Sequence, residues 1–120
     1  MSDVPAAKPI TISIENTDRA IIATPQMKLM DDDALKALTR LVDEAAANNP
    51  AIPLVVLDLS RVLILPSLAL GALVQMDKKC RAREQKLKLA GVQPPVRKVF
   101  AITRLDRVFQ FADSVDAAME

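Results

Sequence analysis

The most informative stretch of the chain is Pro53-Leu54-Val55-Val56-Leu57-Asp58-Leu59. It is a nearly continuous apolar run in which polar side chains do not alternate with apolar ones. This pattern predicts a strand that is buried on both faces. Such strands lie in sheets that helices cover, so we expect an α/β fold.

Two helical patterns flank this strand. Upstream, apolar residues recur at helical spacing over residues 35–45, directly after Asp31-Asp32-Asp33. Acidic residues suit a helix start because they face its unpaired N–H groups and the positive end of its dipole. Downstream, residues 67–83 predict a second long helix. Its expected apolar stripe consists of Leu70, Leu73, Val74, Met76 and Cys80.

The rest of the chain continues the same alternation of strands and helices. Period-2 or apolar runs predict further strands at residues 10–15, 20–24, 86–90 and 108–111. Two more helices are predicted, at residues 94–102 and, after Ser114 as N-cap, at residues 115–119. The expected order is ββαβαβαβα, a mixed β-sheet with helices packed on it. We expect a disordered leader at residues 1–8 and a single domain at residues 9–120.

Composition narrows the class of protein. The 120 residues carry a formal net charge of +1, which argues against a general nucleic-acid binder. The charge is uneven: residues 1–60 hold 5 Lys/Arg and 9 Asp/Glu, whereas residues 61–120 hold 11 and 6. The second half therefore offers a basic face for an acidic partner, or simply a solvated helix surface.

The expected location is the cytoplasm, without membrane insertion. The N-terminus lacks the basic and apolar regions of a signal peptide, and the single Cys80 cannot form an internal disulfide. The longest apolar run, residues 62–74, is interrupted by Pro66, Ser67 and Gly71. It is also shorter than the roughly 20 residues that a membrane span needs.

An enzyme, a metal site and a cofactor are not expected. The chain has no His, the commonest general base and metal ligand, and its two glycines cannot form the usual phosphate-binding loop. A carboxylate-only hydrolase around Asp58 and Asp77 is the enzymatic alternative. Asp31-Asp32-Asp33 is better explained as a helix start than as a cation site. Cys80 lies on the apolar stripe, which favours a buried thiol over a reactive one.

Four segments in order resemble the STAS domain family, in its anti-sigma-factor-antagonist type. They are the strand and turn at residues 55–62, the loop and helix start at 64–71, the strand and glycine turn at 87–92, and residues 94–109. In the last of these, Ile102-Thr103-Arg104-Leu105-Asp106-Arg107-Val108-Phe109 is similar to the family's Leu-Thr-Gly-Leu-Asp-Arg-Leu-Phe. Together the four segments imply the STAS fold over about residues 10–119.

The resemblance also implies a partner-switching function. Such antagonists bind an anti-sigma factor that is itself a serine kinase, which phosphorylates the first serine of the loop; a serine phosphatase reverses this. That serine corresponds to Ser67. The implied partner-binding residues are Asp58, Ser60, Pro66, Ser67, Leu68, Leu70 and Gly71.

The loop departs from the family pattern at the residues beside Ser67. Pro66 stands where the family usually has Asp, and Leu68-Ala69 replaces Ser/Thr-Gly. Ser67 therefore has two readings, a phosphorylated switch or an N-cap that only stabilises the helix. If it is only a cap, we expect a constitutive STAS adaptor, either a scaffold in a signalling assembly or an accessory subunit of a transporter.

Overall fold

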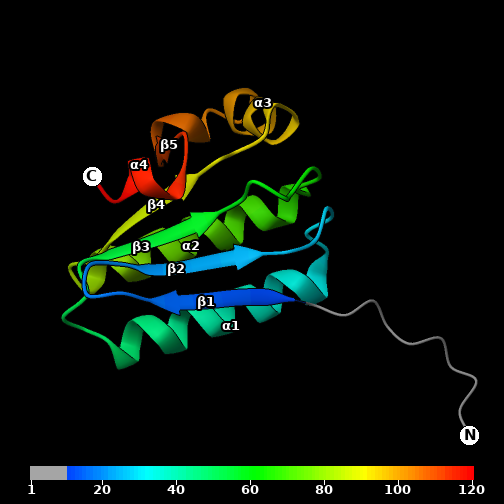
Figure 1. Ribbon diagram of the computed structural model, residues 1–120. Coiled ribbons are helices and arrows are strands. Elements are labelled where there is room, and N and C mark those ends of the chain that lie inside the picture. The colour runs from blue at the N-terminus through cyan, green and yellow to red at the C-terminus, as the bar shows by residue number, and fades with distance from the viewer. Residues whose placement is uncertain (1–10) are drawn as a thin grey trace, which may run out of the picture.

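The computed structural model describes residues 11–120 (Figure 1). The predicted leader at residues 1–8 and the start of the first predicted strand lie outside these residues. The observed order of strands and α-helices confirms the predicted ββαβαβαβα. The elements are β1 (Ile12–Asn16), β2 (Ile21–Pro25), α1 (Asp32–Asn48), β3 (Leu54–Asp58), α2 (Ser67–Ala82), β4 (Lys86–Ala90), α3 (Pro94–Ile102), the 3-10 helix η1 (Leu105–Arg107), β5 (Gln110–Ala112) and α4 (Val115–Ala118).

The strands form one mixed sheet in the order β1-β2-β3-β4-β5 (Figure 1). β1 pairs with β2 in antiparallel fashion, and the other three pairings are parallel. The carboxyl ends of the four parallel strands β2–β5 therefore lie at the same end of the sheet. The connections that follow β2, β3 and β4 gather at this carboxyl end, where α/β proteins commonly carry their functional groups.

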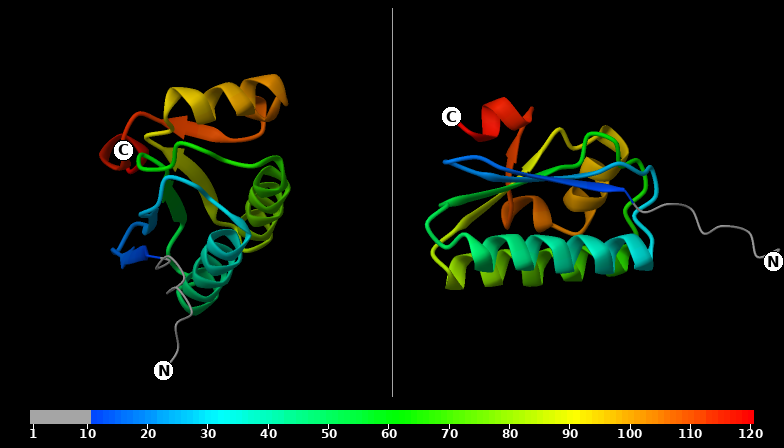
Figure 2. Two further views of the ribbon diagram at one scale, coloured as in Figure 1. Left: turned by 90° about the vertical axis from the view of Figure 1, so that its right-hand side faces the viewer. Right: turned by 60° about the horizontal axis from the view of Figure 1, so that its bottom comes forward.

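The helices cover the two faces of the sheet unequally. α1 and α2 lie side by side on one face, and α4 lies on the other (Figure 2). On the helix-rich face, Val55 and Leu57 of β3 belong to the main core. On the opposite face, Val56 packs in a smaller cluster with Ala118 of α4. The prediction that this central strand is buried on both faces is confirmed.

Three phenylalanine rings pack α3 against β5, the last strand of the sheet. The buried ring of Phe100 meets Phe109 and Phe111 edge-on, with centroids 5.6 and 5.4 Å away. The Arg97 guanidinium carbon lies 3.9 Å from the centroid of the Phe111 ring. Because the chain has no other aromatic residue, these contacts supply all of the aromatic packing in an otherwise aliphatic core.

The last strand starts later than predicted. β5 begins at Gln110 rather than at Val108, because the chain first forms the 3-10 helix η1. Arg104 leads into this helix with a φ of 62°, in the left-handed region that favours glycine. The resemblance placed a glycine at this position, so Arg104 is a strained substitute for it.

The predicted helix start at Asp31-Asp32-Asp33 and the predicted N-cap at Ser114 are confirmed. Asp31 accepts a hydrogen bond from the Ala34 backbone N–H at 2.9 Å, and Ser114 accepts one from Ala117 at 3.1 Å. Among residues 11–120, no helix combines the length and apolar composition that crossing a membrane requires.

Candidate functional site

The turn after β3 is ordered by a carboxylate and a glycine. Asp58 accepts a hydrogen bond from the Ser60 backbone N–H at 3.1 Å. Gln93 donates from its side chain to the Ser60 carbonyl at 2.7 Å, tying the turn to the start of α3. Gly91 has a φ of +64°, and a Cβ there would stand 3.0 Å from the Ser60 Cβ. Asp58 is therefore a residue that orders the loop.

The next part of the loop pairs with the connection between β2 and α1. The backbone N–H groups of Leu63 and Ile64 donate to the Lys28 carbonyl at 2.8 and 2.9 Å. The Met30 N–H donates back to the Ile64 carbonyl at 3.0 Å. Val62 and Leu65 on either side of this pairing are buried. These anchors fix the loop and leave the side chains between them pointing outward.

Four large apolar side chains in these paired loops and in the first turn of α2 are exposed. These side chains, here called the apolar rim, are Leu29, Leu63, Ile64 and Leu68. Leu29 and Ile64 are joined by a parallel β-bridge although they are far apart in the sequence. Large exposed apolar side chains that gather in one place commonly mark a protein-binding surface. Among them, only Leu68 was predicted from the sequence as a contact residue.

Ser67 is not the N-cap of α2, so this part of the prediction is wrong. Pro66 takes an extended backbone, with a φ of −63° and a ψ of 155°, and is itself the residue before the helix. No side chain caps this end. Ser67 is the first helical residue, and it is exposed.

The backbone at this helix start keeps free donors. The Ala69 N–H donates to the Pro66 carbonyl at 2.9 Å. Within the described residues, the N–H groups of Ser67 and Leu68 make no backbone or side-chain hydrogen bond. An exposed hydroxyl thus sits beside two free N–H groups at the positive end of a 16-residue helix.

The predicted partner-binding residues do not all reach the surface. Ser67, Leu68 and Gly71 are exposed, and Leu68 keeps 67% of its accessible surface. Asp58, Ser60 and Pro66 are half-buried. Leu70 keeps only 5% and belongs to the core, so we leave it out of the contact surface.

An acidic cavity also lies at the carboxyl end of the parallel strands. This cavity of about 280 Å³ is lined by Asp58, Ser60 and Gly91, and by the segment around α4 with Asp113 and Asp116. The residues in positions 11–120 include no cluster of acidic, Cys or His side chains that could hold a metal ion. Neither Asp113 nor Asp116 was predicted from the sequence as a site residue.

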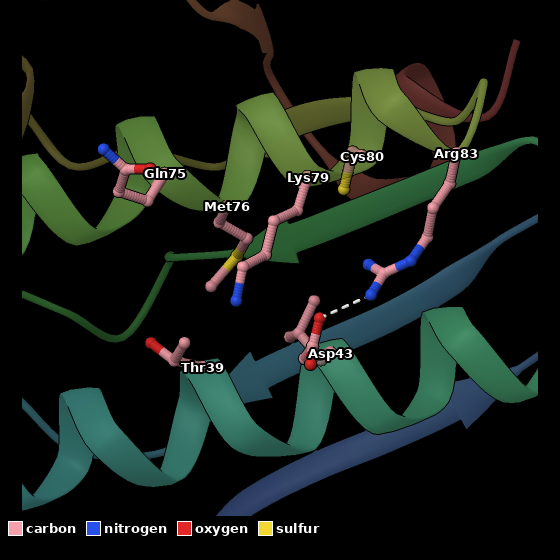
Figure 3. Close-up of a pocket in the computed structure, with 8 residues that line it drawn as sticks. Thr39, Asp43, Gln75, Met76, Lys79, Cys80 and Arg83 are labelled. Atoms are coloured by element: carbon pink, nitrogen blue, oxygen red, sulfur yellow. Dashed lines mark hydrogen bonds and ion pairs between the residues drawn. The ribbon is translucent and has the colours of Figure 1, made fainter.

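Cys80 and Asp77, the other candidates from the sequence, lie away from the carboxyl end of the parallel strands. Cys80 is buried between α1 and α2, and burial raises the pKa of its thiol to about 11 (Figure 3). The predicted buried thiol is confirmed, and it stays protonated at neutral pH.

The two carboxylates of the hydrolase alternative do not meet. Asp77 is buried, forms an ion pair with Arg81 at 3.0 Å and lines a cavity with Lys86, the first residue of β4. Asp58 pairs with Ala90, the last residue of β4. These two ends of the strand are about 13 Å apart at the usual rise per residue. The geometry does not assemble a carboxylate pair.

Comparison with known proteins agrees with the fold. A model described as the STAS domain matches residues 11–118. An anti-sigma factor antagonist from Mycobacterium paratuberculosis is 25% identical, with a TM-score of 0.78 over 92% of this chain and 91% of that one. An anti-sigma-factor antagonist (STAS) domain protein from Planctomyces limnophilus is 20% identical, with a TM-score of 0.77 over 90% and 94%. The phosphorylated form of Bacillus SpoIIAA is 18% identical, with a TM-score of 0.67 over 89% and 96%.

Proposed function

Since the chain belongs to the STAS domain family, we propose that it is an anti-sigma-factor antagonist whose binding to an anti-sigma-factor kinase is controlled by phosphorylation of Ser67. The observation that carries the proposal is the surroundings of Ser67. Its exposed hydroxyl stands at an uncapped helix start and is flanked in the chain by members of the apolar rim. One location thus offers both a surface to bind and a group to modify.

Partner binding rests on the apolar rim. Burying Leu68 and Ile64 in an interface would remove apolar surface from water, which favours association by about 25 cal/mol for each Å². The loop is already fixed by its hydrogen bonds to Lys28 and Met30. Little conformational entropy is then lost on binding, so the surface is prepared for a partner.

Phosphorylation is compatible with the folded state. A phosphate on Ser67 would meet the free N–H groups of Ser67 and Leu68 and the positive end of the α2 dipole. The modified helix start therefore does not need to unfold. For the partner the effect is opposite, because a charge of about −1.5 to −2 enters an apolar contact. Repulsion and desolvation then release it.

The proposed activity is binding rather than catalysis. The chain has no His, and Asp58 and Asp77 lie near opposite ends of β4, so the carboxylate pair of the hydrolase alternative is not assembled. The proposed partners are an anti-sigma factor with serine-kinase activity and a serine phosphatase that restores the free hydroxyl.

A second candidate follows from Pro66. This residue supplies neither the negative charge nor the side-chain cap that Asp would bring to the helix start. A kinase that reads an acidic residue before the serine would then not modify Ser67. The chain would be a constitutive adaptor, in a signalling assembly or on a transporter, that uses the same apolar rim.

Capture of partners from lysate of the native cell separates the two candidates. Immobilised wild type, Ser67→Ala and Ser67→Glu are compared, and the captured proteins are identified by mass spectrometry. A switch predicts that wild type and Ser67→Ala capture a kinase-like anti-sigma factor and that Ser67→Glu does not. Gln75→Glu is the matched control, because it adds one negative charge on the same exposed helix about 12 Å further along.

The outcomes are distinct. Capture of the same proteins by all four forms would contradict the switch and favour the constitutive adaptor. If the switch is correct, incubation of wild type with the captured kinase and ATP should place phosphate on Ser67, as read by peptide mass spectrometry. Phosphate found only on another residue would also contradict the proposal.

A further inference from the structure

A groove between α1 and α2 lies away from Ser67 and is not used by the proposed switch. Its main cavity has a volume of about 320 Å³ and is lined by Leu35, Thr39 and Asp43 from α1 and by Ala72 and Lys79 from α2. Along α1 the groove extends from position 35 to position 43, or about 12 Å. The volume falls at the lower end of the range of roughly 300–1,000 Å³ found for ligand sites.

The floor of the groove is apolar and continues inward. A smaller cavity of about 30 Å³ shares Thr39, Asp43 and Lys79 with the main one, and is further lined by Met76 and Cys80. Figure 3 shows Lys79 extending from α2 toward α1, above this inner part. An apolar chain laid along the groove would therefore find apolar contacts below it and a cation at its side.

The charged side chains that line the groove are predominantly basic. Lys36 and Arg40 line it on α1, and Lys79 lines it on α2. Within the described residues, neither Lys36 nor Lys79 forms an ion pair. The one carboxylate in the lining, Asp43, already accepts a hydrogen bond from Arg83 at 2.6 Å. An anionic group would thus meet two ammonium groups that form no ion pair, whereas the one carboxylate in the lining that a cationic group would meet already pairs with Arg83 and lies near Lys79.

We propose that this groove binds an anionic amphiphile, a single acyl chain with a carboxylate head group, free in solution. The acyl chain would lie over Leu35 and Ala72 with its end toward Met76. The carboxylate would face Lys36 and Lys79. The volume suits one chain of medium length rather than a folded partner, and the charge selects against neutral and cationic heads.

Titrations followed by amide NMR shifts test this on the whole chain. The probes are octanoate, octan-1-ol, octylammonium and acetate, each below any micelle-forming concentration. Octanoate should shift the signals of Thr39, Asp43, Ala72 and Lys79 in a saturable way. We expect its affinity to exceed that of octylammonium by about tenfold, since a cationic head meets the same sign of charge. Acetate should give no saturable shift, because it lacks the chain.

Two pairs of variants localise the effect. Lys79→Glu should weaken octanoate binding by about fivefold, whereas Lys78→Glu, exposed on the same helix outside the groove lining, should leave it unchanged. Ala72→Leu should fill the groove and abolish binding, whereas Ala82→Leu, exposed at the end of α2, should not. Unchanged circular dichroism and unfolding midpoint show that each variant is folded.

Several results would overturn the proposal. Equal binding of octanoate and octylammonium, or shifts that cluster outside the groove, would show that the basic side chains of the groove do not select the ligand. Absence of octanoate shifts together with binding to phosphatidylglycerol vesicles would assign the basic surface to lipid membranes instead. None of these results bears on Ser67, because the proposed switch is tested by partner binding and by phosphorylation of Ser67.

Discussion

The two long helices begin in opposite ways. α1 starts after Asp31, whose carboxylate accepts a hydrogen bond from Ala34, and two more acidic residues follow in its first turn. α2 starts after Pro66, with no side-chain cap and no acidic residue in its first turn. Both helices are long and pack on the same core. The first helix start is capped by a side chain, and the second leaves backbone donors and a hydroxyl free.

The first turn of α2 also separates stability from binding, because it carries one buried leucine and one exposed leucine. Leu70→Ala should destabilise the fold by about 2–4 kcal/mol, because it empties a buried core position. Leu68→Ala, two residues earlier, should change the free energy of unfolding by less than about 0.5 kcal/mol, since that side chain is exposed. Urea unfolding measures both values.

Partner capture should show the reverse order. Leu68→Ala should capture less anti-sigma factor than wild type, while Leu70→Ala should capture it normally at temperatures where it remains folded. If Leu68→Ala captures the partner as wild type does, the apolar rim is not the contact surface, and the proposed role of this helix start loses its main support.

Charge at Ser67 should separate binding from stability. Ser67→Glu should lower partner affinity at least about tenfold, roughly 1.4 kcal/mol, because a carboxylate enters an apolar contact. The same change should leave the fold equally stable or stabilise it by about 0.3–1 kcal/mol, since a negative charge suits a helix start. Titration calorimetry with the captured partner and urea unfolding give the two numbers. A loss of affinity accompanied by an equal loss of stability would mean that the substitution acts by unfolding.

The element order could be predicted because it depends on local patterns. Each pattern predicts an element within a few residues of itself. The apolar run before Asp58 predicts a strand, the helical spacing after Asp31 predicts a helix, and Ser114 predicts a helix start. Cys80 likewise could be placed in the core from its position on an apolar stripe. The STAS resemblance added the order of the segments, which the family match over residues 11–118 supports.

What could not be predicted depends on contacts between distant segments. Leu29, Leu63 and Ile64 are exposed because the loops carrying them hydrogen-bond to each other, and no local pattern shows that pairing. The helix start at residue 67 was predicted correctly, but its N-cap was misplaced by one residue, because Pro66 suits either the position before a helix or its first turn. That single residue changes Ser67 from a cap to a free hydroxyl.

The caps themselves offer a smaller test of the comparison. Asp31→Ala should destabilise the fold by about 1 kcal/mol, since the Ala34 N–H loses its acceptor. Ser67→Ala should change stability by less than about 0.3 kcal/mol, because no cap is lost. Thermal and urea unfolding of the two variants check this pair. A loss of about 1 kcal/mol in both would restore Ser67 as a cap and weaken the distinction between the two helix starts.

The smallest expected effect concerns the sides of the two helices, where Asp43 of α1 meets Arg83, just after α2. The hydrogen bond from Arg83 lowers the pKa of Asp43 below its ordinary value of 3.8. A lowered carboxyl pKa stabilises the folded state above the ordinary value, and this contribution is lost as the pH falls through the folded-state pKa. Because the Asp43 side chain is 41% exposed, Asp43→Asn should cost at most about 0.5–1 kcal/mol at neutral pH. The difference from wild type should vanish in urea unfolding at a pH well below 3.8. Glu44→Gln, which removes an exposed pair with Arg40 at 3.6 Å, is the control and should change stability less at either pH. A difference for Asp43→Asn that persists at low pH would show that packing, not charge, joins the helices here.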